Sequence, residues 1–141
     1  MSLTLAEART IIENAAAKAN EIGAKCAIAV VDPGGHVISI DVLDGANLYK
    51  DKMAKGKALA ALVLGQNTHE ALDMHQTKPT RYFGLLSLFS GELYFSGGGV
   101  LIETEGEIVG AIGIAGGKMG ADEVMASAGI AAWRAEFNKP E

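Results

Sequence analysis

The chain has 141 residues and a mass of 14.6 kDa, a length typical of one domain. Hydrophobic residues make up 49% and charged residues 21%, which excludes a disordered chain and is enough for one buried core. The net charge of −5 gives no basic field to attract nucleic acid or anionic lipid. We therefore expect a folded protein with neither kind of partner.

Cysteine content and apolar runs indicate where the protein works. Cys26 is the one cysteine, which excludes an internal disulfide framework and a cysteine-rich metal site, and fits a reducing compartment. Residues 1–7 lack the pattern of a signal peptide, and no apolar run approaches the ~18 residues that cross a bilayer. The sequence thus predicts a cytoplasmic protein without a membrane segment and without a metal site.

The first part of the chain predicts a helix followed by a hairpin. Thr4 and Glu7 have the spacing of a capping box, and apolar residues then recur every three or four positions up to Gly23, a typical helix stop. Residues 26–31 form a short, continuously apolar run that ends in a Pro-Gly-Gly turn, and residues 36–43 alternate partially. These two segments predict paired antiparallel strands.

The middle of the chain predicts helices and then a loop. Residues 48–64 are strong helix formers, and Thr68 is in a position to cap a short helix over residues 70–74. Pro79 is expected to stop any continuation. Residues 77–92 have no clear period, which predicts a long loop, and such loops often line binding sites.

The last part predicts a second hairpin and a final helix. Residues 100–102 and 107–114 form the two strands, and the second contains Gly110 and Gly113, which favour close approach of another backbone or of a ligand. Residues 122–137 form a helix rich in small residues. Because strands are joined as hairpins and helices are grouped, the order predicts one α+β domain over 1–141 with helices packed on an antiparallel sheet.

Several motifs occur together in an order that resembles the GlcG/HbpS-like family. They are residues 3–8, the strand and turn 28–35, Asp44-Gly45-Ala46, Lys57-Ala58, residues 97–102 and 107–114, Asp122-Glu123 and Ala128-Gly129. The resemblance covers almost the whole chain. It implies a profilin-like fold, an oligomer often built from dimers, and binding or degradation of haem. Some members stand beside diol and glycolate catabolism, and at least one is a cofactor-free lyase that removes ammonia from a hydroxylaminobenzoate.

Two glycine-rich segments are candidate ligand-binding sites. Three successive residues without Cβ can form a nest of N–H groups for an anion, or simply enter a strand. Two further glycines and a lysine precede the last helix, where free N–H groups and the dipole favour a carboxylate, unless the segment is a plain connection. The candidates are Gly97, Gly98, Gly99, Gly116, Gly117 and Lys118.

Lys57 and Arg81 are the candidate cations for a ligand carboxylate. Lys57 lies on an alanine-rich helix and either pairs with a ligand or extends to water. Arg81 precedes Tyr82 and Phe83, a set that could clamp a planar aromatic acid or else pack beneath a loop.

The three histidines are expected to be solvated. His69 and His75 are six residues apart, which does not place both on one helical face, so a shared zinc site is not expected. Haem iron needs only one imidazole, and His36, His69 or His75 could supply it.

The leading hypothesis is a small-ligand-binding protein with haem as the ligand and no other cofactor. The alternative is a cofactor-free lyase or isomerase of a small aromatic or hydroxy acid, in which Tyr82, Glu92 or His36 moves a proton. A third is an accessory subunit that only assembles with others. Small-residue helices and hairpin edges also favour a homo-oligomer.

Overall fold

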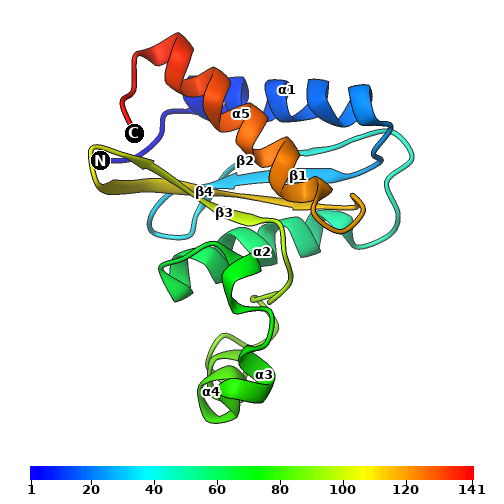
Figure 1. Cartoon of the computed structure of the whole chain (residues 1–141), viewed down its shortest axis with the longest axis vertical. Coiled ribbons are helices and arrows are strands. Elements are labelled where there is room, and N and C mark those ends of the chain that lie inside the picture. The colour runs from blue at the N-terminus through cyan, green and yellow to red at the C-terminus, as the bar shows by residue number, and fades with distance from the viewer.

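The computed structural model describes residues 1–141 and contains a four-stranded sheet and five α-helices (Figure 1). No helix has both the length and the apolar character required to cross a membrane. The elements are α1 (Leu5–Ile22), β1 (Ala27–Val31), β2 (Val37–Val42), α2 (Lys50–Leu64), the 3-10 helix η1 (Thr68–Ala71), α3 (Met74–Thr77), α4 (Pro79–Leu88), β3 (Gly99–Thr104), β4 (Glu107–Ala115) and α5 (Ala121–Phe137).

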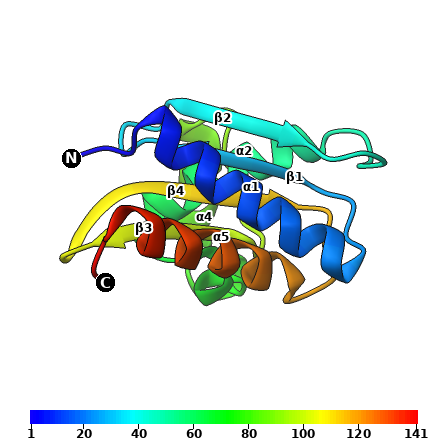
Figure 2. The same cartoon turned by 90° about the horizontal axis from the view of Figure 1, so that it is seen from above.

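The sheet has the strand order β2-β1-β4-β3, and every neighbouring pair is antiparallel. Ala29 of β1 lies opposite Ile40 of β2 and Gly113 of β4, and Gly113 in turn lies opposite Gly99 of β3. α1 and α5 lie side by side across one face of the sheet, and α2 covers the other (Figures 1 and 2). The predicted α+β architecture is confirmed.

The two faces of the sheet carry side chains of different size. Toward α1 and α5 the strands present large apolar residues, which pack with Trp133 and Met125 of α5 into the main core. Toward α2 they present mainly alanines and Gly113, together with Val31, and these meet the alanines of that helix. A Cβ on Gly113 would collide with the carbonyl oxygen of Ala54 in α2. The glycines of this strand therefore admit a neighbouring backbone, one of the two predicted reasons for them.

The prediction of a loop over residues 77–92 is wrong, because α4 occupies most of that range. Pro79 lies at the start of α4, where its missing N–H costs nothing and its fixed φ suits a helix. A residue interpreted as the end of one helix thus begins another. Thr68 is likewise not a cap: Asn67 occupies the N-cap of η1, and Thr68 Oγ1 accepts a 2.9 Å hydrogen bond from Gly99 N.

A buried carboxylate joins α1 to α5. The predicted capping box is present, and Glu7 Oε2 also accepts a 2.7 Å hydrogen bond from Trp133 Nε1. Burial by itself raises the pKa of Glu7, but the hydrogen bonds from Trp133 and Thr4 outweigh it, so the pKa lies below its ordinary value of 4.5. Glu7 therefore stabilises the fold above pH 4.5, and this contribution is lost as the pH falls through the lowered pKa.

We expect Glu7→Gln to flatten the acid limb of the stability profile. Between pH 6 and about pH 3, the free energy of unfolding of the native protein should fall more than that of the variant, since glutamine does not titrate. Urea unfolding at several pH values measures this difference. Glu13→Gln, an exposed change on the same helix, is the control and should keep the native slope. Equal slopes for the native protein and Glu7→Gln would contradict the assignment.

Candidate functional site

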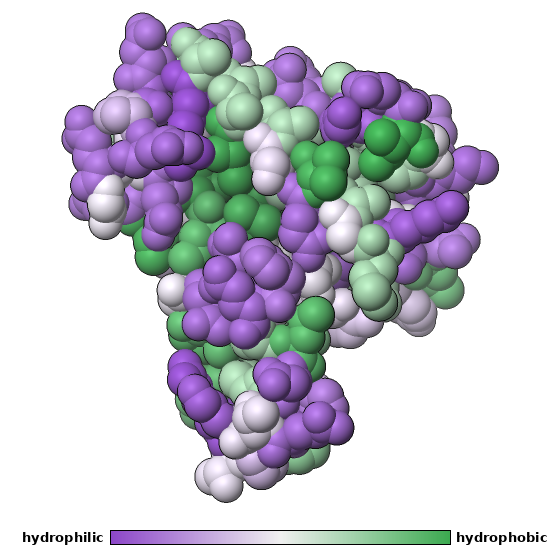
Figure 3. Space-filling model, in the orientation of Figure 1, coloured by the Kyte–Doolittle hydropathy of each residue, from purple (hydrophilic) through white to green (hydrophobic).

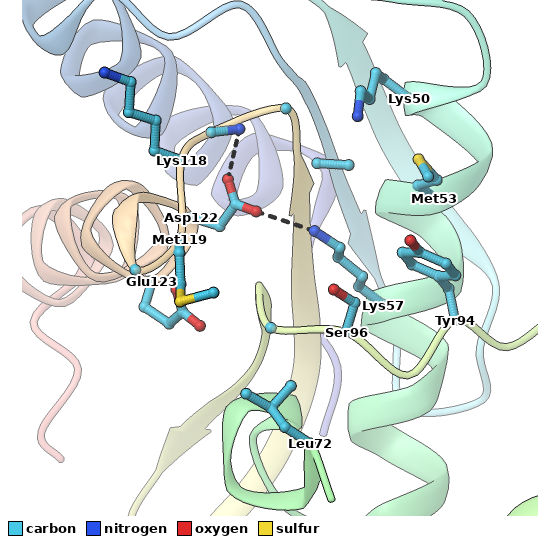
Figure 4. Close-up of a pocket in the computed structure, with 15 residues that line it drawn as sticks. Lys50, Met53, Lys57, Leu72, Tyr94, Ser96, Lys118, Met119, Asp122 and Glu123 are labelled. Carbon is cyan, nitrogen blue, oxygen red and sulfur yellow. Dashed lines mark hydrogen bonds and ion pairs between the residues drawn. The ribbon is translucent and has the colours of Figure 1, made fainter. Parts of the chain in front are cut away.

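A cavity of about 340 Å³ opens at the end of β4, between α2, the segment that leads into β3, and the β4–α5 loop (Figure 4). Its size is close to the lower limit of about 300–1,000 Å³ found for small-molecule sites. Its wall includes the side chains of Lys50, Met53, Lys57, Tyr94, Ser96, Lys118, Met119, Asp122 and Glu123.

A buried ion pair forms the inner wall of this cavity. Lys57 Nζ of α2 lies 3.0 Å from Asp122 Oδ2 of α5 and donates a 2.8 Å hydrogen bond to the carbonyl oxygen of Ile114. Lys57 is 5% exposed and Asp122 6% exposed. An ammonium has three N–H groups, and the third has no acceptor within the protein. One donor of a buried cation is therefore available to a ligand.

Asp122 also fixes the loop that forms the opposite wall. Its Oδ1 accepts a 2.9 Å hydrogen bond from Gly117 N, and it lies in the first turn of α5, where a carboxylate is favoured by the helix dipole. The sequence did not identify Asp122 as a site residue, because an acidic residue at this position is equally typical of the first turn of a helix, which it stabilises. Its partner, Lys57, was selected.

Other polar groups around the cavity have no partner in the protein. The Tyr94 hydroxyl, Ser96 Oγ and the Glu123 carboxylate make no intramolecular hydrogen bond, and Lys50 and Lys118 add two unpaired ammonium groups (Figure 4). Sequence reasoning missed all of these except Lys118. The arrangement can bind a ligand that has both an anionic and an apolar part.

The predicted glycines divide into two groups. Gly97, Gly116 and Gly117 line the cavity together with Lys118. A Cβ on Gly116 would also collide with the carbonyl oxygen of Lys25. Gly98 and Gly99 do not line the cavity and meet other parts of the backbone: a Cβ on Gly98 would lie 2.5 Å from the carbonyl oxygen of Ile114, and one on Gly99 would collide with that of Lys57. For these two glycines the close approach of the backbone accounts for the absence of a side chain.

The structure does not bring Arg81 to this cavity. Arg81 lines a separate hollow of about 90 Å³ near the end of α2. Tyr82, its neighbour, packs among aromatic rings, 5.1 Å from Phe83 and 5.3 Å from Phe95 between ring centroids. The predicted clamp of an arginine with two aromatic rings is thus not formed around the cavity that contains Lys57.

His36 and Glu92 do not line that cavity either. His36 is exposed, and its Nδ1 lies 3.2 Å from Asp32 Oδ1 in the β1–β2 turn. Glu92 lines a groove of about 320 Å³ against α2. Burial raises the pKa of the Cys26 thiol to about 11, the charge of Asp122 adding to the effect, so this cysteine is a poor nucleophile. No constellation of these residues resembles a catalytic centre.

The fold and the site define an α+β domain with a cavity at one end of its sheet that is lined by both lysines and carboxylates. The chain belongs to the family of haem degrading HbpS-like proteins, whose model matches residues 3–131. The resemblance seen in the sequence motifs is confirmed.

Two curated relatives cover most of the chain. It is 31% identical to an uncharacterised 15.0 kDa protein of the dhaT-dhaS intergenic region of Citrobacter freundii, over 92% of this chain and 90% of that one. It is also 31% identical to the corrinoid adenosyltransferase PduO of the same organism, over 94% of this chain but only 39% of that enzyme.

A solved structure described as a PduOC:heme complex shares the fold. It superposes with a TM-score of 0.84 at 26% identity, covering 94% of this chain and 95% of that one. The family and this complex support haem as a ligand, and none of the comparisons points to the lyase or isomerase alternative.

Proposed function

We propose that this protein binds haem in the cavity beside Lys57 and Asp122. The single observation that carries the proposal is the Lys57 ammonium, which is buried at the cavity wall with one N–H unpaired. A buried donor without a partner is costly, and a ligand carboxylate or a bound water would satisfy it. Haem has two propionate groups, and Lys50 and Lys118 provide further cations for them.

The remaining wall residues fit the rest of a haem group. Protein ligands of haem iron include tyrosine and methionine as well as histidine, and Tyr94, Met53 and Met119 line the cavity. Of the three histidines, His69 lies beside the wall, with its Cβ 3.9 Å from where a Cβ on Gly97 would stand. When bound, haem would supply its own iron chemistry. Lys57, Lys50 and Lys118 would hold its propionates, and Tyr94, Met53, Met119 or His69 would bind its iron.

The relatives support a role in small-molecule catabolism. A segment similar to this chain forms part of the corrinoid adenosyltransferase PduO. We infer that this protein has an accessory role beside small-diol or small-acid catabolism. Its contribution to that role would be to bind haem or a small carboxylate.

A haem titration tests the proposal. With the native protein we expect a shifted Soret band between about 380 and 420 nm that saturates at about one haem per chain. Lys50→Met/Lys118→Met should weaken haem binding about tenfold. Each partly exposed charge pair is worth up to about 1 kcal/mol, so the loss of two pairs comes to roughly the 1.4 kcal/mol that corresponds to a factor of ten.

The matched control is Arg81→Met, which removes a cation outside the cavity and should leave the affinity unchanged. Absence of a Soret shift at tens of micromolar haem would overturn the proposed ligand. A native affinity in the double lysine variant would overturn the proposed site.

A further inference from the structure

The loop between β4 and α5, residues 116–120, separates two hollows. Gly116, Gly117 and Lys118 line the cavity of about 340 Å³ on one side and a second hollow of about 430 Å³ on the other. The second hollow is also lined by residues 22–25, at the end of α1. The loop is therefore a thin wall, and its displacement would join the two spaces into one.

Asp122 is the side chain that fastens this loop (Figure 4). Its Oδ1 accepts the 2.9 Å hydrogen bond from Gly117 N, while its Oδ2 lies 3.0 Å from Lys57 Nζ. One carboxylate thus holds both the loop and the ammonium on α2. Each contact uses a separate oxygen, so a side chain with one acceptor oxygen can keep only one of the two.

The loop has few other features that hold it in place. Three of its five residues are glycine, and Met119 is completely exposed. Segments that bury few apolar side chains open locally at a small cost in free energy. On the face shown in Figure 3, the surface around the start of α5 combines hydrophilic and hydrophobic residues, which fits a ligand with an anionic and an apolar part. An opening at this loop therefore leads to a surface that such a ligand can approach.

The closed cavity is small for the ligand of the proposed function. Its volume of about 340 Å³ is near the lower limit of small-molecule sites, whereas haem has four linked rings and two propionates. We propose that Asp122 is a positioning residue that controls entry of the ligand: it holds Lys57 and the loop in one closed arrangement, and release of Gly117 opens the cavity toward the second hollow. The identity of the ligand rests on the proposed function, but the opening is a property of the protein without ligand.

Two buried side chains distinguish this opening from global unfolding. Cys26 is fully buried, and a Cβ on Gly116 would lie 3.0 Å from the Cβ of Cys26, so the loop covers this thiol. Trp133 is equally buried, and its Nε1 donates to Glu7 of α1. The experiment compares the rate at which a thiol reagent labels Cys26 with the rate of hydrogen exchange at the Trp133 indole, in the full chain without ligand. We call the first rate divided by the second the labelling ratio.

Asp122→Asn should release the loop. The amide has one acceptor oxygen, and the charged Lys57 competes for it more strongly than the N–H of Gly117. The labelling ratio should rise about tenfold, which corresponds to about 1.4 kcal/mol. Glu123→Gln is the matched control, because Glu123 lines the same cavity but makes no hydrogen bond to the loop, and it should keep the native ratio.

Gly120→Ala should open the loop without a change to the ion pair. Gly120 has a φ of 85°, where alanine is strained although nothing lies within 4 Å of its Cβ. The closed loop should become less stable and the labelling ratio should rise severalfold. Gly65→Ala introduces the same kind of strain at a φ of 68°, but at the end of α2, and should leave the labelling ratio unchanged.

The rate of haem association, followed at the Soret band, connects the opening with the ligand. Asp122→Asn and Gly120→Ala should both bind haem faster than the native protein. An unchanged labelling ratio in these two variants, or haem association no faster than in the native protein, would overturn the proposal. If the native protein bound no haem while both variants raised the labelling ratio, the proposed ligand would be wrong and the role of Asp122 in the opening would be supported.

Discussion

We expect Lys57→Met to lower the free energy of unfolding by about 3–5 kcal/mol, because it leaves the carboxylate of Asp122 buried without its cation. Both members of the pair are almost fully buried, so solvent screens the remaining carboxylate only weakly. The same change also removes the donor to the Ile114 carbonyl oxygen. Urea unfolding at neutral pH measures the loss.

Two variants make this result specific to the buried pair. Lys57→Met/Asp122→Leu should recover most of the stability, since replacing a buried ion pair by apolar residues of similar volume is often close to neutral. Lys18→Met breaks an exposed pair with Glu21 and should cost less than about 1 kcal/mol. If Lys57→Met lowered the free energy of unfolding as little as Lys18→Met, the ion pair would not stabilise the contact between α2 and α5.

The second large effect concerns the contact between α2 and the sheet. We expect Gly113→Ala to destabilise the fold by about 3 kcal/mol, the upper part of the range for overpacking a core. The added Cβ would collide with the carbonyl oxygen of Ala54, and the nitrogen of Ala58 would lie only 2.8 Å away. Both are backbone atoms, so a side-chain rotation cannot relieve the contact, and the helix itself has to move.

Gly84→Ala is the matched control for this substitution. Nothing lies within 4 Å of a Cβ at that position, which is inside α4. Alanine is the better helix former there, so the variant should be more stable by roughly 0.5–1 kcal/mol. Thermal unfolding of both variants gives the comparison. A Gly113→Ala protein as stable as the native one would mean that α2 does not lie against β4 as described.

Local signals explain why most of the fold was predictable. The capping box at Thr4 and Glu7, the apolar run of β1 and the glycines of β4 each reflect forces that act within a few residues. α4 was missed because Pro79 was interpreted as the end of a helix, whereas it lies in the first turn of one. A proline is compatible with both positions, so the residue alone does not distinguish them.

The candidate site was less predictable because it joins distant segments. Lys57 was identifiable as a cation on a helix of small residues, but its partner Asp122 is 65 positions away in the chain. Tyr94 reaches the cavity through the course of the backbone between α4 and β3. Arg81 has suitable chemistry for a carboxylate, but α4 carries it to another part of the surface. Residue type alone did not determine which cations share a cavity.

Nuclear magnetic resonance with haem tests most directly whether the ligand occupies the cavity beside Lys57 and Asp122. As paramagnetic ferric haem is added to isotope-labelled protein, the amide signals of Gly97, Gly116 and Gly117 should broaden first, since these glycines line the cavity. The signals of Gly35 and Gly84 should stay sharp. Broadening centred on Gly35 or Gly84, with unchanged signals at Gly116 and Gly117, would place the ligand elsewhere and contradict the account.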